Sequence, residues 1–332
     1  MTNARPEVRP GVSREEISSQ PARIGIVYNP RSHRNKGQDL YLGGREDVIV
    51  ATPQTRGQIV DVLEDFARRG IRHIVINGGD GTVRDVLTCG QGVFGDDWPE
   101  LAILPKGKTN ALNVDLGAPA DTSLVEAIEA FDKGRRILRR PLHITQIDGD
   151  DAPLVGFILG AGAFTVGVSA GQDAHRLGFF NSLAVGMTAG WGVLQALFGR
   201  DSNPWRRGVP MDIRLLPDGR PAPHSGSGDP SRREVVFAST LHRMPMRLKP
   251  FGPERGGLKL AIMDRARRRL LASLPAILAG WQPNWLSRAG LHQLDCTAFE
   301  FIIGDRFILD GEAFPAGAYR VAQGPEITFV TA

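Results

Sequence analysis

The chain has 332 residues, of which 42% are hydrophobic, and a formal net charge of +4. This length allows two ordinary domains or one large one, and the apolar fraction is sufficient for a sizeable core. Its two cysteines, Cys89 and Cys296, lie far apart in the sequence, which excludes a disulfide framework or a cysteine metal site and indicates a reducing compartment.

The first residues of the chain differ from the rest. Residues 1–21 are polar and charged and contain no apolar stretch of the kind a signal peptide needs, so we expect a disordered arm there.

Basic residues are bunched further along, for example at Arg135–Arg136 and at Arg267–Arg269. Such clusters suit an anionic partner, either nucleotide phosphates or acidic lipid headgroups.

From residue 23 to about residue 140, strands and helices are predicted to alternate. Short apolar runs predict strands, and apolar residues at helical spacing predict helices. The strands are expected at 23–29, 46–51, 72–77 and 101–104, and the helices at 56–69, from 83 onward and at 121–133. This alternation indicates a parallel sheet covered by helices, in which ligands bind beyond the carboxyl ends of the strands.

Three polar loops follow strands of this predicted sheet. They begin at Asn29, at Gly78-Gly79-Asp80-Gly81-Thr82 and at Gly107. Glycine lets the backbone approach a bulky anion, and a helix start behind it offers free N–H donors. A carboxylate inside a phosphate loop suggests a divalent cation, because the two groups would otherwise repel. An ordinary strand–helix turn is the alternative for Gly-Gly-Asp-Gly alone.

After about residue 140 the pattern changes to short strand-like runs separated by turns. They are expected at 142–147, 154–159, 211–216, 234–239, 258–263, 298–303 and 306–309, with a solvent loop over 217–233. This pattern predicts an antiparallel sandwich or barrel.

The uncharged segment from Leu177 to Gly199 is long enough to span a bilayer, but its glycines and polar residues favour a buried or membrane-facing helix.

The predicted domains follow from this division. We expect an α/β domain over 22–140, a β-sandwich domain over 141–312, and a C-terminal segment over 313–332 that can return to the first domain.

Five segments, in order along the chain, resemble the diacylglycerol kinase catalytic-domain family, which includes bacterial lipid kinases, sphingosine kinases and ceramide kinases. They are Asn29-Pro30-Arg31-Ser32, the stretch from Gly78 to Val86, the stretch from Leu104 to Asn110, the stretch from Phe157 to Phe164, and Asp310-Gly311-Glu312. The resemblance implies a nucleotide domain followed by a β-sandwich lipid domain, and an enzyme that uses ATP and Mg²⁺ to phosphorylate a hydroxyl of a membrane lipid.

The resemblance also implies the residues of the nucleotide site. Those expected to contact the nucleotide are Asn29, Pro30, Ser32, Thr52, Gly78, Gly79, Asp80, Gly81, Thr82, Gly107, Lys108, Thr109 and Asn110.

The catalytic residues expected from the resemblance are Asp310, Glu312 and Asp80. Asp310 would accept the proton of the lipid hydroxyl, and Glu312 would hold metal or orient Asp310. Asp80 would act through Mg²⁺ or the phosphates, so Asp80 and Glu312 are the expected metal ligands. Without the resemblance, Asp310-Gly311 is typical of a hairpin turn.

Two departures from the family pattern bear on substrate and metal. Lys108 stands where the family has a hydroxyl residue; a P-loop reading of Gly107-Lys108-Thr109 fails because Ala102 replaces its leading glycine. The Asn110-Ala111 pair favours a ceramide or sphingoid-type acceptor over diacylglycerol. The stretch from Glu254 to Leu258 lacks the aspartate that relatives often place before its glycine, which puts in doubt the structural metal seen in some relatives.

The remaining expectations concern partners. The acceptor would lie near apolar residues such as Phe157 and Phe164, and Arg267–Arg269 with the apolar stretch 270–285 would contact an anionic membrane. We expect a cytoplasmic protein, peripheral at the inner membrane face, with no nucleic-acid partner; a homodimer is left open. The alternatives are a soluble kinase of the NAD kinase type, and a non-catalytic lipid- or nucleotide-binding protein.

Overall fold

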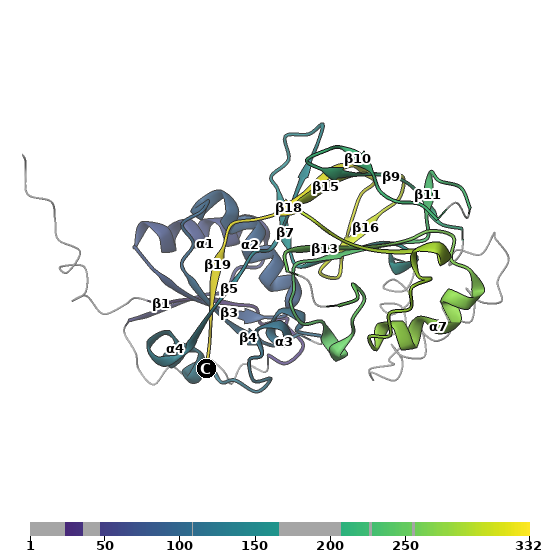
Figure 1. The fold of residues 1–332 in the computed structure, drawn as a ribbon. Coiled ribbons are helices and arrows are strands. Elements are labelled where there is room, and N and C mark those ends of the chain that lie inside the picture. The colour runs from purple at the N-terminus through teal and green to yellow at the C-terminus, as the bar shows by residue number, and fades with distance from the viewer. Residues whose placement is uncertain (1–23, 36–46, 108, 166–206, 226–227, 254–255) are drawn as a thin grey trace, which may run out of the picture.

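The computed structural model describes residues 24–35, 47–107, 109–165, 207–225, 228–253 and 256–332. The predicted N-terminal arm, Lys108, the stretch from Leu177 to Gly199 and the pair Glu254–Arg255 lie outside these residues. Element labels follow Figure 1. None of the helices in the described ranges is long and apolar enough to cross a membrane.

The first part of the chain is built on a six-stranded sheet in the order β2-β1-β3-β4-β19-β5. β1 to β4 are parallel, β19 is parallel to β4, and β5 is antiparallel to β19. The strands are β1 (Ile24–Tyr28), β2 (Val48–Ala51), β3 (His73–Gly78), β4 (Glu100–Pro105), β5 (Arg135–Arg139) and β19 (Ile327–Thr331). Strands β1, β3 and β4 are almost wholly buried, as expected for parallel strands covered on both faces.

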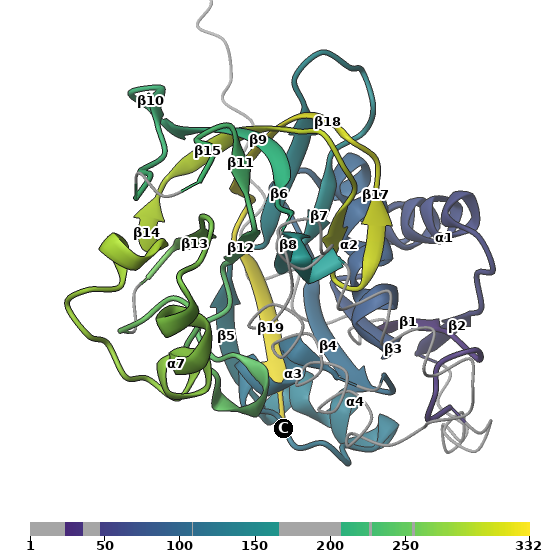
Figure 2. The ribbon, with the colours of Figure 1, turned by 90° about the vertical axis from the view of Figure 1, so that its right-hand side faces the viewer.

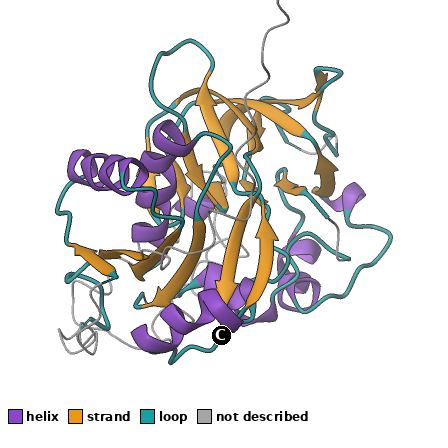
Figure 3. Cartoon of the chain, turned by 90° about the vertical axis from the view of Figure 1, so that its left-hand side faces the viewer, coloured by secondary structure: helices purple, strands orange, loops and turns teal. Residues whose placement is uncertain are grey.

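Helices cover both faces of this sheet (Figure 3). One face packs against α1 (Arg56–Arg68), α2 (Asp80–Phe94) and α3 (Ala111–Leu116), and the other against α4 (Leu124–Lys133). α1 begins at Thr55, whose hydroxyl accepts from the Gln58 N–H, and α4 begins with a capping box between Ser123 and Glu126. In these two helices a local side chain therefore satisfies a backbone N–H of the first turn.

The second part is a sandwich of two antiparallel sheets. Their orders are β10-β9-β15-β18-β6-β7, with β11 paired to β9, and β14-β13-β12-β8-β16-β17. The first contains β6 (Leu142–Gln146), β7 (Leu154–Gly156), β9 (Val209–Leu216), β10 (Arg220–Pro221), β11 (Arg232–Arg233), β15 (Ala298–Ile303) and β18 (Gly317–Gln323). The second contains β8 (Ile158–Gly162), β12 (Val235–Ser239), β13 (Leu258–Met263), β14 (Leu291–Cys296), β16 (Phe307–Leu309) and β17 (Glu312–Phe314).

The sandwich core is aromatic at its centre: Phe299, Phe301 and Phe307 are fully buried, and Phe301 and Phe307 meet edge to face. Outside the two sheets lie α7 (Arg268–Leu278) and the short helices η3 (Pro245–Arg247) and η4 (Ser287–Ala289).

The two parts are joined by packing as well as by the chain. Val155, Phe157 and Leu241 of the second part belong to the same apolar cluster as α1 and α2. The Thr88 hydroxyl of α2 bonds both the N–H and the carbonyl of Val155. Figure 2 shows β17 lying beside α2, so the end of the sandwich sheet approaches the start of that helix.

The predicted fold class is confirmed: a parallel α/β sheet is followed by an antiparallel sandwich. One detail was wrong: the loop predicted over 217–233 contains the short strands β10 and β11. Strand β5, which carries the basic pair Arg135–Arg136, was not predicted. Alternating apolar residues are absent from both stretches. β5 forms by pairing with the distant strand β19, whereas β10 and β11 both pair with the nearby strand β9.

Candidate functional site

The three predicted loops meet at the carboxyl edge of the first sheet. The Asn29 side-chain amide donates to the Thr82 hydroxyl at 2.8 Å, which joins the end of β1 to the start of α2. The N–H of Arg34 donates to the Lys106 carbonyl, which joins the first loop to the loop after β4. The topology rule that places such loops at one edge therefore predicts their contact correctly.

Two glycines allow the loops after β3 and β4 to touch. A Cβ atom on Gly79 would lie 2.8 Å from the Gly107 Cα, and a Cβ on Gly107 would lie 2.8 Å from the Gly79 Cα. Backbone atoms cannot withdraw from such contacts as a flexible side chain can. Both positions therefore require glycine for the loops to pack as they do.

Asn110 and Asp80 close the loop after β4. The Asn110 side chain accepts from the Gly107 N–H and donates to the Gly107 carbonyl, and its backbone has a left-handed φ of 50°. The Asp80 carboxylate accepts from the backbone N–H groups of Asn110, Ala111 and Leu112. Asp80 thus binds the start of α3, so the acid of the glycine loop also fixes the neighbouring loop.

Burial raises the pKa of Asp80, although its three backbone hydrogen bonds oppose the rise. A carboxyl group in low-dielectric surroundings favours its neutral form unless donors or cations offset the lost hydration. Asp80 is therefore an acid whose ionised state depends on its immediate neighbours.

Asp310 lies in the turn between β16 and β17. Leu309 pairs with Glu312 across this turn, and Asp310 and Gly311 have φ values of 43° and 86°, so the pair forms a two-residue hairpin turn. The Asp310 carboxylate accepts from the N–H groups of Phe157 and Ile158, each at 2.9 Å. Asp310-Gly311 can therefore form a hairpin turn and also supply a site residue, because the turn directs the Asp310 carboxylate toward the junction of β7 and β8.

Asp80 and Asp310 come from opposite ends of the chain and interact electrostatically. Burial, followed by the negative charge of Asp80, raises the pKa of Asp310 to about 7, against the lowering effect of its two backbone donors and of Arg84. Like charges in a partly desolvated site disfavour joint ionisation. The arrangement keeps a proton-accepting carboxyl group poised near neutral pH, as a general base requires.

A network of two arginines and two acids surrounds this pair. Arg84, which is 6% exposed, pairs with Asp85 and Glu312 and donates to the Leu309 carbonyl at 3.3 Å. Arg56 pairs with Asp85 and with Glu312 at 2.9 and 2.8 Å. Glu312 therefore binds two arginines, and Arg84 connects α2 directly to the hairpin that carries Asp310.

A cavity of about 260 Å³ opens beside these loops, at the ends of β1 and β2 and over the start of α2. Its lining includes two of the predicted residues, Asn29 and Thr82. The other lining residues are Val27, Tyr28, Arg31, Pro53, Gln54, Thr55, Arg56, Ile59 and Asp85.

The other predicted nucleotide residues are placed differently. Pro30 and Ser32 lie in the turn after β1, where the Ser32 N–H donates to the Asn29 carbonyl. Thr52 is exposed just after β2 and does not line the cavity, whereas its neighbours from Pro53 to Arg56 do. Gly78 ends β3, Gly81 lies in the first turn of α2, and Thr109 lies in the loop after β4. Lys108 lies outside the described residues.

Sequence reasoning missed Arg56, Arg84 and Asp85 as site residues. Arg84 and Asp85 follow the glycine loop after Val83, and a basic residue one helical turn after Asp80 was the available signal. Among the residues that the structure describes, no three His, Cys, Asp or Glu side chains gather as potential metal ligands.

Comparisons with known proteins find a similar domain and a similar fold. Residues 23–140 match the family model described as the diacylglycerol kinase catalytic domain. A stretch of 82 residues is 33% identical to an Escherichia coli protein named probable lipid kinase YegS, and covers 25% of this chain and 24% of that protein. The aligned stretch thus spans about a quarter of this curated relative.

Solved structures are similar over nearly the whole chain. A diacylglycerol kinase from Bacillus anthracis covers 94% of this chain and 97% of its own, with a TM-score of 0.65 and 14% identity. A putative diacylglycerol kinase from the same organism gives a TM-score of 0.63 and 16% identity. The resemblance read from the motifs is therefore confirmed: residues 23–140 match the diacylglycerol kinase catalytic domain, within a chain that has the fold of these bacterial proteins.

Proposed function

We propose that this protein is an ATP-dependent lipid kinase, which transfers the γ-phosphoryl group of ATP to a hydroxyl of a membrane lipid. One observation carries the proposal: the acid of the glycine loop, Asp80, lies close enough to Asp310 to raise its pKa. The proposal therefore places a phosphate-binding loop and a base in one site. The catalytic-domain match and the relative named as a probable lipid kinase support the same reaction class.

The nucleotide would bind at the edge where the three loops meet. In this proposal the glycine loop 78–82 and the loop 107–110 face the phosphates, Asn29 and Thr82 line the adjoining cavity, and Arg31 and Arg56 add positive charge. Pro30, Ser32 and Thr52 flank that cavity. Backbone N–H groups and cationic side chains are the usual partners of phosphate oxygens.

The acids of the site fit a divalent cation. Asp80 and Asp310 disfavour each other's ionisation, and a cation beside them would relieve that repulsion. Asp80 is the residue that we propose to hold Mg²⁺; Glu312, whose charge is already paired with Arg56 and Arg84, fits this role less well. Bound Mg²⁺ would neutralise charge on the β- and γ-phosphates.

Asp310 is the proposed general base. Its carboxylate would accept the proton of the lipid hydroxyl as the alcohol oxygen bonds to the γ-phosphorus and ADP leaves. Glu312 is proposed as a positioning residue that acts through Arg84, because Arg84 bonds both the Glu312 side chain and the backbone of the Asp310 turn. Of the two roles expected for Glu312 from the sequence, holding metal and orienting Asp310, this proposal adopts the second.

The acceptor would approach from the sandwich side of Asp310. Phe157, whose N–H binds Asp310, is buried against Phe329, so its ring is part of the core, whereas Phe164 is partly exposed. The Asn110-Ala111 pair favours a ceramide or sphingoid-type lipid, with diacylglycerol as the next candidate. The proposal includes peripheral contact with an anionic membrane at its cytoplasmic face, where ATP is available.

The test is phosphoryl transfer from γ-labelled ATP. The purified protein is incubated with Mg²⁺ and, in separate reactions, ceramide, sphingosine, diacylglycerol and NAD, and the products are separated by thin-layer chromatography. We expect label on a lipid. Label on NAD alone would identify a soluble kinase of the NAD kinase type. If no label appears on any of these acceptors, nor on any component of a total lipid extract, the protein is non-catalytic.

A further inference from the structure

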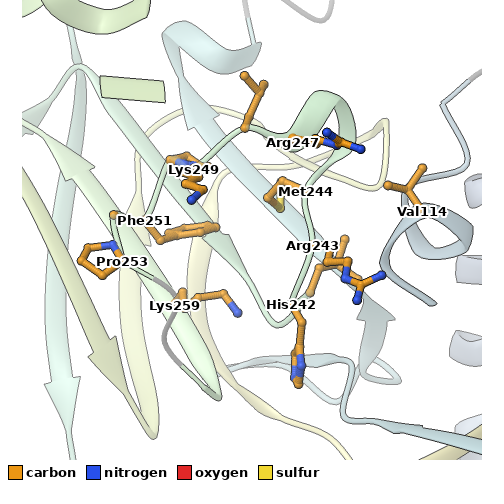
Figure 4. Close-up of a pocket in the computed structure, with 13 residues that line it drawn as sticks. Val114, His242, Arg243, Met244, Arg247, Lys249, Phe251, Pro253 and Lys259 are labelled. Atoms are coloured by element: carbon orange, nitrogen blue, oxygen red, sulfur yellow. The ribbon is translucent and has the colours of Figure 1, made fainter. Parts of the chain in front are cut away.

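A second cavity lies away from the nucleotide loops, between α3 and the segment that joins β12 to β13. Its volume is about 460 Å³, larger than that of the cavity beside Asn29. Figure 4 shows its lining side chains. They are Val114, Leu241, His242, Arg243, Met244, Arg247, Leu248, Lys249, Pro250, Phe251, Gly252, Pro253 and Lys259.

The charges of this basic pocket are all of one sign. Four of its lining residues, Arg243, Arg247, Lys249 and Lys259, have cationic side chains, and none of the described lining residues is acidic. Arg243, Arg247 and Lys249 are exposed, and their side chains form no ion pair within the described part of the chain. Such a concentration of unpaired positive charge attracts anions.

Lys259 provides the strongest indication of a ligand. It is 4% exposed, and its ammonium group has no hydrogen-bond partner in the described chain. Burial lowers its pKa, although Asp115 and Asp295 attract the charge from a distance. Asp115 does not reach it, since one oxygen pairs with Arg139 and the other accepts from the Arg243 N–H.

A buried ammonium without a partner is costly, and an anion in the pocket would relieve that cost. In Figure 4 the Lys259 amine extends into the space bordered by Phe251, Arg243 and His242. The Phe251 ring lies 6.0 Å from the amine nitrogen and supplies an apolar wall. The pocket therefore combines a buried cation with apolar surface.

The turn beside this pocket presents an apolar side chain to solvent. Met246 is 84% exposed, and both Met246 and Arg247 have left-handed φ values, 56° and 57°. This backbone region is strained for residues other than glycine, and such strain is concentrated at functional positions. Exposed methionine next to Arg247 and Lys249 suits the boundary between lipid headgroups and acyl chains.

We propose that the basic pocket binds the phosphate group of an anionic membrane phospholipid, with Lys259 as its buried cation and Met246 entering the apolar layer beside it. A soluble anion would use the charges but not the exposed methionine or the apolar wall. Neither Asp80 nor Asp310 lines the pocket, and the proposed binding needs no nucleotide, so it can be tested without phosphotransfer.

The experiment is sedimentation with vesicles in the absence of ATP, for the whole chain. The vesicles are phosphatidylcholine alone or phosphatidylcholine with phosphatidylserine. Lys259→Met removes the buried charge, and Lys133→Met, at the exposed end of α4, removes an equal charge elsewhere. We expect binding only to the anionic vesicles, weakened about tenfold or more by Lys259→Met and little by Lys133→Met.

Thermal unfolding accompanies the binding measurement. Because Lys259→Met removes an unpaired buried charge, the variant should unfold at the same temperature as the native chain or higher. Met246→Ser should also weaken vesicle binding. Equal binding by both lysine variants would overturn the assignment of Lys259, and stabilisation by inorganic phosphate without vesicle binding would overturn the lipid as ligand.

Discussion

At the scale of single residues, the site depends on how neighbours set the ionisation of Asp310. Burial and the charge of Asp80 raise its pKa to about 7, while the N–H donors of Phe157 and Ile158 and the charge of Arg84 lower it. A base must be ionised to accept a proton, so the raised pKa determines the pH range in which Asp310 can act.

The first prediction is a pH profile. Asp310 is neutral on the acid side of its pKa and ionised on the alkaline side, so the rate of lipid phosphorylation should rise with pH and level off above about 7. Steady-state rates measured from acid to mildly alkaline pH check this. A rate that is flat across neutral pH would contradict the role of Asp310.

The second prediction concerns Arg84. Its charge lowers the pKa of Asp310, so Arg84→Met should move the midpoint of the pH profile to higher pH, and Arg84→Lys should restore part of the native midpoint. Thermal unfolding of both variants serves as the folding control. If the rate falls at every pH and the midpoint does not move, Arg84 has only a structural role and does not set the pKa of Asp310.

At the scale of elements, two loops touch through a pair of glycines. Gly107→Ala would place a Cβ against the Gly79 backbone, and the resulting strain should cost about 1–3 kcal/mol of stability and weaken nucleotide binding. Gly92→Ala in α2 is the matched control, because no atom lies within 4 Å of the Cβ position of residue 92. This variant should be about 0.5–1 kcal/mol more stable than the native chain. Chemical denaturation and nucleotide titration of both variants test this; equal stabilities would show that the loops tolerate separation.

Elements were predictable from the sequence where the signal is local. The buried strands β1, β3 and β4, the helix from Arg56 and the glycine loop follow from apolar runs, helical spacing and glycine chemistry. The meeting of Asn29 with Thr82 follows from sheet topology.

Other features were not predictable because their causes are distant in sequence. β5 forms by pairing with β19, about 190 residues later. Its exposed arginines interrupt the apolar pattern that would otherwise predict a strand. Apart from Asp85, the partners of Arg84 lie in the hairpin more than 220 residues away. No local pattern indicates that Glu312 would bind arginines.

At the scale of the whole molecule, the chain returns to its first sheet after completing the sandwich. β19 lies between β4 and β5, and its Phe329 is fully buried and meets Phe157 edge to face. Phe157 in turn donates its N–H to Asp310. The last strand therefore links the core of the first domain to the segment that holds the candidate base.

The fourth prediction follows from this link. Phe329→Ala should cost about 3–5 kcal/mol of stability, because it empties a core position shared by both parts. Thr328→Ala, on a partly exposed side chain in the same strand, should cost much less. Denaturant unfolding followed by probes in each part checks both; separate transitions in the native chain would show that the two parts are not coupled.

The most direct test of the convergence of Asp80 and Asp310 is lipid phosphorylation by Asp310→Asn, measured together with ATP binding and thermal unfolding. Asp305→Asn, at an exposed position near the same hairpin, is the control. We predict that Asp310→Asn still binds ATP but loses about 10²- to 10⁴-fold in turnover, whereas Asp305→Asn keeps the native rate. Near-native turnover by a folded Asp310→Asn protein would contradict the account.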